Sequence, residues 1–413
     1  MAVWEFNRGE WTEAYVFLRL LGEGRIYGAS AELVRDDKIY IDIVNVIRAE
    51  PNAYARFERF IENEIAKVKA FDKDNVIFKV ITGPELNEKA SFLYHEIMAS
   101  SGGKRKLKVP AIQEYLEELR FSSPKANLSD EAKQAYGAKA DIIITAQNSL
   151  DNSTSTEGFS VKSHLGSNPT LFNCSQTSGF VYRIVGCNLE GMHRINALNS
   201  LKTMIAAIKK DYSLEYVGCR NAVFEQNIGI VDSRMDEILN VAILAVNGYY
   251  NHDISTDLPT VCDTLTNLNP IKRANPKEFY SAKIKDFLFA SFAGLTASTP
   301  WSGRKKLTGG YIDVGQTGEL LYYRAISDDI FANYLFKNTK IDMPDRGVCK
   351  ALALERAGIY LSEHRNLTKD EENAIIFVDG ISGKKNSKKG DFGYVYEKDN
   401  EFFIDLNFQI RFR

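Results

Sequence analysis

The sequence predicts a fold of the α/β (α+β) class, in which helices and strands follow one another through the first half of the chain. Two strand-like segments, 140–146 and 158–166, flank the polar, turn-forming stretch 151–158. From about 189 to 293 the apolar residues recur at helical spacing, and after Pro300 they alternate as in strands. We therefore expect three parts, which are residues 1–188, 189–299 and 300–413.

The first half begins with a helix whose start and end are both clearly indicated by the sequence. Asn7 and Glu10 make a capping-box pattern, and apolar residues then recur at helical spacing until Gly22 and Gly24 end the helix. Later helices are expected over 54–71, 88–98, 111–119 and 129–136, and strands over 38–46 and 76–81.

The second half predicts helices first and strands afterwards. The helical period is clearest over 196–210, 236–246 and 277–292. Strand-like alternation follows over 310–314, 320–325, 393–396 and 401–412.

The composition is that of an ordinary globular protein. The 413 residues are 44% hydrophobic and 26% charged, and the net charge is -2. A DNA-binding protein with this balance must gather its basic residues on one face. The 5 cysteines form no CxxC pair, no apolar run is long enough to span a membrane, and no targeting pattern opens the chain. We therefore expect a cytoplasmic protein with reduced thiols and no membrane span.

The two central strands carry the chemically most informative residues. Asp141 lies near the start of the first strand, and Ser160 and Lys162 share one face of the second. A carboxylate that binds a cation and an amine that steers a water are the minimal parts of a magnesium-dependent phosphodiesterase. The simpler alternatives are a surface acid at a strand edge and a solvated lysine.

Six segments in the same order resemble the HpaII-type family of type II restriction endonucleases, which belongs to the PD-(D/E)xK nuclease class. They are 7–13, 158–166 with 169–173, 299–301, 309–314, 338–340 and 406–412. The resemblance implies a nuclease core with a mixed central sheet flanked by helices in 1–188, a mainly helical region in 189–299, and a β-rich region in 300–413 that contributes to DNA recognition.

The same resemblance implies the reaction and the partners. We expect Mg²⁺-dependent, sequence-specific cleavage of double-stranded DNA, at CCGG (the site of the family's type member) or a related short palindrome. A homodimer would cut both strands, and a companion DNA methyltransferase would protect the host DNA without forming a stable complex.

One departure from the class pattern concerns the second metal-binding carboxylate. Ser160 stands two residues before Lys162, where the class has Asp or Glu, so another segment must supply this acid. Glu13 on the first helix is the preferred candidate, because Glu10 already has a role in capping that helix. Glu157 is a third candidate, for which solvation beside the polar turn is the alternative.

The expected metal ligands are thus Asp141 and Glu13, with Glu10 as the alternative, and the expected catalytic residues are Asp141, Lys162, Glu13 and Ser160. Candidate DNA contacts are amide, imidazole and basic side chains, which read base edges or bind phosphates. They are His164, Asn173, Gln176, Arg304, Lys305, Lys340 and Arg346. A structural histidine, turn-forming amides and solvated surface charges are the alternatives.

Three other functions stay open at this level. One is a structure-specific repair nuclease built on the same core. Another is a catalytically inactive DNA-binding scaffold protein, and the departure at Ser160 is its only support. An unrelated α/β protein remains if Asp141 and Lys162 lie far apart in the folded chain.

Overall fold

A computed structural model describes residues 3–51, 53–100, 106–137, 139–173, 177–198, 200–250, 254–304, 309–325, 328–342 and 392–413. The chain divides into two compact units. The first comprises Met1–Pro169 and Lys305–Leu335, and the second comprises Thr170–Arg304 and Phe336–Arg413. These boundaries fall elsewhere than those of the expected three parts, which stay a prediction.

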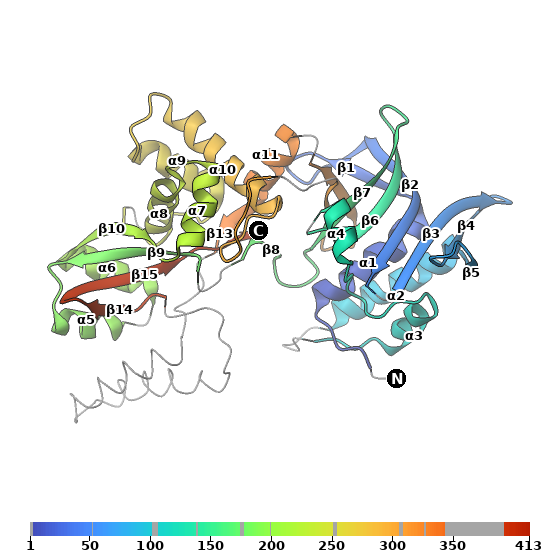
Figure 1. Ribbon diagram of the computed structural model, residues 1–413, viewed down its shortest axis with the longest axis horizontal. Coiled ribbons are helices and arrows are strands. Elements are labelled where there is room, and N and C mark those ends of the chain that lie inside the picture. The colour runs from blue at the N-terminus through green and yellow to red at the C-terminus, as the bar shows by residue number, and fades with distance from the viewer. Residues whose placement is uncertain are drawn as a thin grey trace. The chain divides into compact units, whose positions relative to one another are not determined.

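The first unit is built on a nine-stranded mixed sheet, in the order β1-β12-β11-β7-β6-β2-β3-β4-β5 (Figure 1). A further pairing of β1 with β2 closes six of these strands into a ring. The β1–β12 and β11–β7 pairs are parallel, and the others are antiparallel. The strands are β1 (Arg25–Ala29), β2 (Arg35–Glu50), β3 (Ala53–Glu62), β4 (Ile65–Phe71), β5 (Ile77–Thr82), β6 (Ile142–Asn148), β7 (Thr154–Ser163), β11 (Gly310–Val314) and β12 (Leu320–Arg324).

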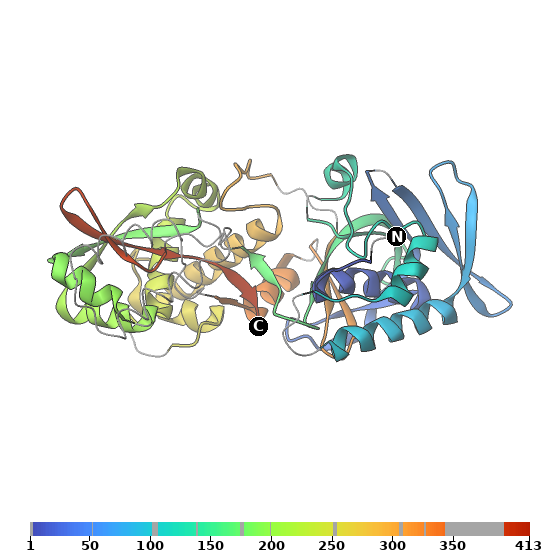
Figure 2. The same ribbon diagram turned by 90° about the horizontal axis from the view of Figure 1, so that it is seen from below.

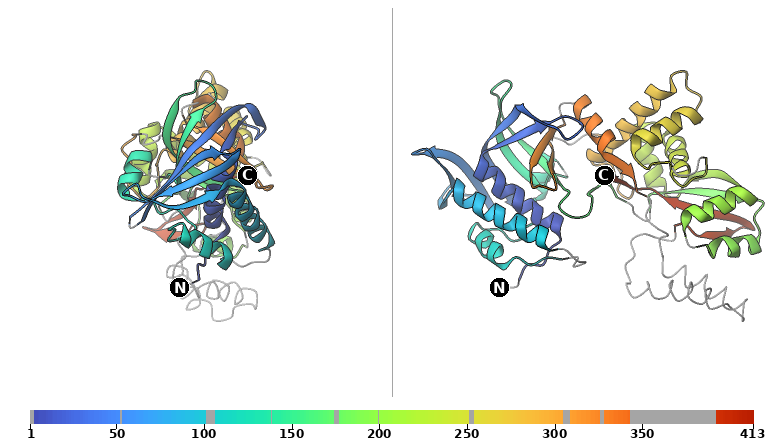
Figure 3. Two further views of the ribbon diagram at one scale, coloured as in Figure 1. Left: turned by 90° about the vertical axis from the view of Figure 1, so that its right-hand side faces the viewer. Right: turned by 180° about the vertical axis from the view of Figure 1, so that it is seen from behind.

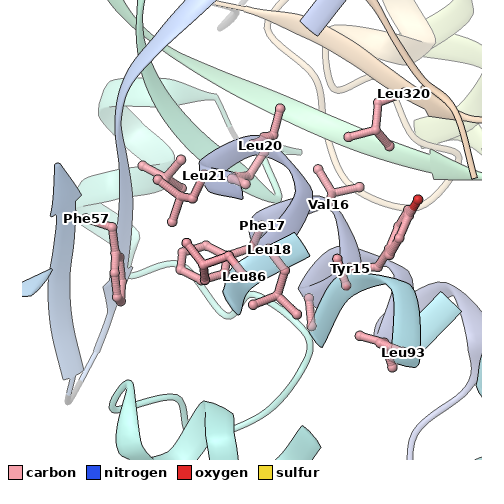
Figure 4. Packing of buried hydrophobic residues seen from close by; sticks show 14 of the residues in the cluster. Tyr15, Val16, Phe17, Leu18, Leu20, Leu21, Phe57, Leu86, Leu93 and Leu320 are labelled. Carbon is pink, nitrogen blue, oxygen red and sulfur yellow. The ribbon is translucent and has the colours of Figure 1, made fainter. Parts of the chain in front are cut away.

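Two long helices of the first unit, α1 (Arg8–Glu23) and α2 (Gly83–Ala99), lie side by side against the sheet (Figure 3). The predicted capping box at Asn7 is present, and Gly24 ends α1 in a left-handed conformation. Phe17 of α1 and Phe57 of β3 meet edge to face, 4.8 Å apart between ring centres, in the main core of the unit (Figure 4). The shorter helices are α3 (Pro110–Glu118) and α4 (Asp130–Tyr136).

The helix expected over 54–71 is wrong, because this segment forms the antiparallel hairpin β3–β4. Asn63 and Glu64 both have positive φ angles, which is the geometry of a two-residue hairpin turn. The buried side chains Ala55 and Phe57 alternate with more exposed ones, which is the period of two typical of a strand.

The second unit combines two small sheets with several helices. Its antiparallel four-stranded sheet has the order β10-β9-β15-β14, and a three-stranded sheet has the order β13-β16-β8 (Figures 1 and 2). The strands are β8 (Thr170–Phe172), β9 (Gly179–Val185), β10 (Ser213–Cys219), β13 (Thr339–Ile341), β14 (Val395–Lys398), β15 (Glu401–Asn407) and β16 (Ile410–Phe412). The helices are α5 (Leu189–Asn196), α6 (Leu201–Asp211), α7 (Ala222–Val231), α8 (Met235–Val246), α9 (Leu258–Leu268) and α10 (Pro276–Phe292).

The structure confirms a mixed fold of helices and sheets. Most of the helices and strands expected after residue 189 are present, but β10 interrupts the helical region, and α11 (Asp328–Asn338) lies in the stretch expected to be β-rich. The sequence also contains a lysine-rich segment at 384–389, which could bind phosphates or be solvated surface, and this segment lies outside the described residues. Across the described part of the chain, every helix is too short or too polar to cross a lipid bilayer.

Candidate active site

The hairpin of β6 and β7 fixes the position of Asp141. The backbone N–H of Asp141, directly before β6, donates to the carbonyl of Phe159 at 2.8 Å. One carboxylate oxygen, Oδ2, accepts hydrogen bonds from the Ser160 hydroxyl at 2.9 Å and from the Val161 N–H at 2.8 Å. Asp141 is therefore held against β7 by three hydrogen bonds, and Ser160 serves as a donor to it.

Lys162 projects from β7 on the same face as Ser160. Its ammonium lies 4.8 Å from the centre of the Tyr311 ring. Because Tyr311 pairs with Ser160 and Asp313 pairs with Lys162 in the parallel β11–β7 register, both β11 residues share this face. The amine thus lies in a partly buried setting beside an aromatic ring and close to Asp141.

Glu13 reaches the same place from α1. Its Oε2 accepts the backbone N–H of Ala126 at 2.7 Å, which fixes the carboxylate. Burial raises the pKa of Glu13 well above its ordinary value, and the neighbouring Asp141 carboxylate raises it further. The Ala126 hydrogen bond and the positive charges of Arg48 and Lys125 act in the opposite direction.

The three groups share one electrostatic environment. Burial raises the pKa of Asp141, and Lys162 is the strongest influence that opposes this rise. Burial lowers the pKa of Lys162, while Asp141 and Glu13 both oppose that fall. The structure therefore brings together the two carboxylates and the amine that the sequence singled out, from three separate segments of the chain.

Two further lysines belong to this surrounding, and the sequence reasoning missed both. Lys125 lies close enough to lower the pKa of Glu13 and of Asp141. The pKa of Lys139 falls to about 8, first because of burial and then because of repulsion by Lys162. Lys139 could have been noticed as a neighbour of Asp141 in the sequence, but no sequence pattern distinguishes Lys125 from a surface lysine.

The alternative acids have other partners. Glu10 accepts the N–H of Asn7 at 2.9 Å, as the capping box requires, and lies 3.9 Å from the amine of Lys125. Glu157 is buried in an ion pair with Arg324 and accepts the hydroxyl of Ser155 at 2.8 Å. Glu13 is therefore the acid beside Asp141 that the contacts favour.

His164 has a buried carboxylate as a neighbour. Its Nε2 lies 3.3 Å from Oδ2 of Asp313, which also accepts the hydroxyl of Tyr334 at 2.6 Å. Asp313 is 2% exposed. This arrangement fits the alternative of a hydrogen-bonded structural histidine, and a DNA contact by His164 stays a prediction.

The other candidate DNA contacts lie outside the first unit or outside the described residues. Asn173 and Arg304 are exposed and Lys340 is partly buried, all three in the second unit. Gln176, Lys305 and Arg346 lie outside the described residues. For all six residues, contact with DNA stays a prediction.

Comparison with known proteins shows which family the chain resembles. A family model described as HpaII restriction endonuclease matches residues 7–348. A curated relative, the Type II restriction enzyme HpaII of Haemophilus parainfluenzae, is 30% identical over 409 residues, which is 98% of this chain and 98% of the relative. No solved structure matches the chain.

Proposed function

The chain belongs to the HpaII restriction endonuclease family, and on this premise we propose that it cuts double-stranded DNA at a specific sequence with Glu13, Asp141, Lys162 and Mg²⁺. The family membership that the sequence motifs predicted is confirmed. The predicted enzyme class is confirmed with it, because the family consists of type II restriction endonucleases, which are site-specific deoxyribonucleases.

One observation carries the proposed site, namely the meeting of two carboxylates and an amine from separate elements. Asp141 precedes β6, Lys162 lies on β7 and Glu13 lies on α1. The Asp141 carboxylate raises the pKa of Glu13, and both carboxylates oppose the fall in the pKa of Lys162. Such a cluster of perturbed groups is typical of a catalytic site.

The donor set suits Mg²⁺. Proteins bind this ion through one or two carboxylates, while waters and substrate phosphates complete its coordination. Glu13 and Asp141 supply two such carboxylates. Among the described residues, no cluster of three or more His, Cys, Asp or Glu side chains offers a fuller set of protein ligands. When bound, Mg²⁺ would supply positive charge to the phosphate and lower the pKa of a bound water.

The protein's own groups have distinct tasks in this proposal. Ser160 and the Val161 N–H hold the Asp141 carboxylate in place, and the Ala126 N–H holds that of Glu13. The Lys162 ammonium orients the attacking water and stabilises negative charge on the phosphate. The water oxygen forms a bond to phosphorus as the bond from phosphorus to the 3′-oxygen breaks. The water releases a proton to solvent and the departing 3′-oxygen takes one up, which leaves a 5′-phosphate and a 3′-hydroxyl.

We further propose that the first unit contains a PD-(D/E)xK core. The support is the antiparallel β6–β7 pair carrying Asp141 and Lys162, the parallel neighbour β11, and α1 packed close by. Ser160 replaces the usual acid and binds Asp141 instead of a metal. The three-part division at 188/189 and 299/300, with DNA recognition in the last part, stays part of the proposal.

The finer functional expectations also rest on the family. We propose CCGG or a related short palindrome as the recognition site, a homodimer as the cutting species, and a companion methyltransferase that protects host DNA. A two-fold symmetric dimer places one active site on each strand of a palindrome. We also propose a cytoplasmic location, where an enzyme of this kind would meet its DNA substrate.

Plasmid digestion with Mg²⁺ tests the function. The wild-type protein is expected to give discrete fragments, and Lys162→Ala is expected to lose cleavage while it still binds the site. Lys67→Ala is the matched control, because Lys67 is also a partly buried strand lysine of the same sheet, paired with Glu62. Equal cleavage by the Lys162→Ala and Lys67→Ala proteins would contradict the proposed site.

Digests of branched and linear DNA, together with a binding assay, separate the rival functions. A structure-specific repair nuclease would cut branched or damaged DNA and leave a linear duplex intact. An inactive scaffold would bind DNA without cutting it at any Mg²⁺ concentration. The family membership and the intact Glu13, Asp141 and Lys162 cluster favour the restriction endonuclease over both.

A further inference from the structure

A buried ion pair holds one loop against the site. Arg48 and Glu50 on β2 form a salt bridge in which their side chains are 7% and 4% exposed. Arg48 also donates to the carbonyls of Ser123 at 3.3 Å and Lys125 at 3.1 Å, and its guanidinium lies 3.9 Å from the centre of the Phe121 ring. We call residues 122–126, which these contacts fix, the anchored loop.

The anchored loop meets the active site at its far end. The N–H of Ala126 donates to Glu13, so the backbone next to Lys125 touches a proposed metal ligand. The Lys125 side chain is 51% exposed, and its amine lies 3.9 Å from the Glu10 carboxylate, near the outer limit of an ion pair. The Lys125 amine is therefore accessible from solvent near Glu13 and Asp141.

We propose that Lys125 binds a DNA phosphate at the active site and that the Arg48–Glu50 pair positions it. The inference rests on the proposed function. A phosphate that approaches Glu13 and Asp141 meets two carboxylates and needs cationic partners. Lys125 supplies such a partner from the solvent side, while Lys162 lies deeper on β7. Because Arg48 already fixes the loop backbone, less conformational entropy is lost when Lys125 binds the phosphate.

DNA binding at several salt concentrations tests this role. The probes are a duplex oligonucleotide containing the site mapped from the wild-type digest and an equally long duplex without it, with Ca²⁺ in place of Mg²⁺ to prevent cleavage. Loss of one phosphate contact makes the slope of log K against log salt less steep by about 0.9. Relative to 1 M salt, this corresponds to a roughly eightfold lower affinity at 0.1 M salt. Lys125→Ala is expected to show this loss on both probes.

Two further variants complete the design. Lys125→Arg keeps the charge and is expected to restore the slope. Lys133→Ala removes a lysine of α4 whose amine lies 3.9 Å from the Asp130 carboxylate. This variant is expected to bind DNA as the wild type does.

The outcomes separate the inference from the proposed function. An unchanged salt slope for Lys125→Ala, with wild-type cleavage intact, overturns the phosphate contact alone. The same holds if Lys125→Ala changes only the pH dependence of cleavage, because Lys125 would then act on the acids instead of the DNA. A wild-type protein that neither binds nor cuts duplex DNA overturns the proposed function and this inference with it.

Discussion

Removal of the Arg48 charge is expected to destabilise the first unit strongly. In Arg48→Met, the Glu50 carboxylate loses its partner although its side chain is only 4% exposed. The carbonyls of Ser123 and Lys125 lose a donor at the same time, whereas the Ser122 hydroxyl still donates to Glu50. Breaking a buried ion pair from one side costs about 3–5 kcal/mol, since a buried charge remains uncompensated.

The sheet itself offers a matched control. Arg56 and Glu58 on β3 also form an ion pair two residues apart, but their side chains are 23% and 44% exposed. Exposed pairs contribute about 0–1 kcal/mol because water screens them. Arg56→Met is therefore expected to lower the free energy of unfolding far less than Arg48→Met does.

Urea unfolding followed by tryptophan fluorescence measures both variants. Trp4 and Trp11 lie in the same unit as Arg48, and Trp11 is fully buried, so their emission reports on this unit. Because the chain has two units, the transition assigned to these tryptophans is compared, not the whole curve. The reasoning is refuted if Arg48→Met loses no more stability than Arg56→Met.

Three further predictions concern the acids and the core. Glu13→Gln keeps the shape of the side chain but removes a proposed metal ligand, so cleavage should require far more Mg²⁺. In the same Mg²⁺ titration, Glu10→Gln should behave as the wild type does. The reverse result would identify Glu10 as the ligand. Because burial raises the pKa of Glu13 and Asp141, the folded state holds their protons more tightly than the unfolded state. Without metal, the free energy of unfolding should therefore fall as the pH rises above about 4, the ordinary range of carboxyl groups; Mg²⁺ should reverse the loss, and thermal melts that are flat in pH and Mg²⁺ would speak against the acid pair. Phe17→Ala should lower the stability of the first unit by about 3–5 kcal/mol, because it leaves a cavity against Phe57, and a urea midpoint within error of the wild type would contradict this packing.

Local sequence signals located most of the hairpin that carries the proposed site. The alternation around Lys162, the polar turn and the helix-ending Gly137 correctly predicted strands β6 and β7 with α4 before them. The capping box at Asn7 likewise predicted the start of α1. These features depend on neighbours within a few residues, so periodicity and capping are sufficient to predict them.

Long-range pairing was not predictable in this way. The parallel placements of β12 beside β1 and of β11 beside β7 join segments far apart in the chain. The hairpin over 54–71 was mistaken for a helix, since a short amphipathic stretch can match either period until its turn residues are weighed.

The sequence alone determined the family and the strand that carries Lys162, and it predicted that another segment supplies the carboxylate missing at Ser160. Only the tertiary structure decided which acid approaches Asp141, because Glu13 and Glu10 lie one turn apart on α1 and differ in what the folded chain places beside them. The Ala126 N–H donates a hydrogen bond to Glu13, whereas the Asn7 N–H donates one to Glu10. Lys125 gains its place from Arg48 in the same way, through contacts between residues distant in sequence, which no local pattern encodes.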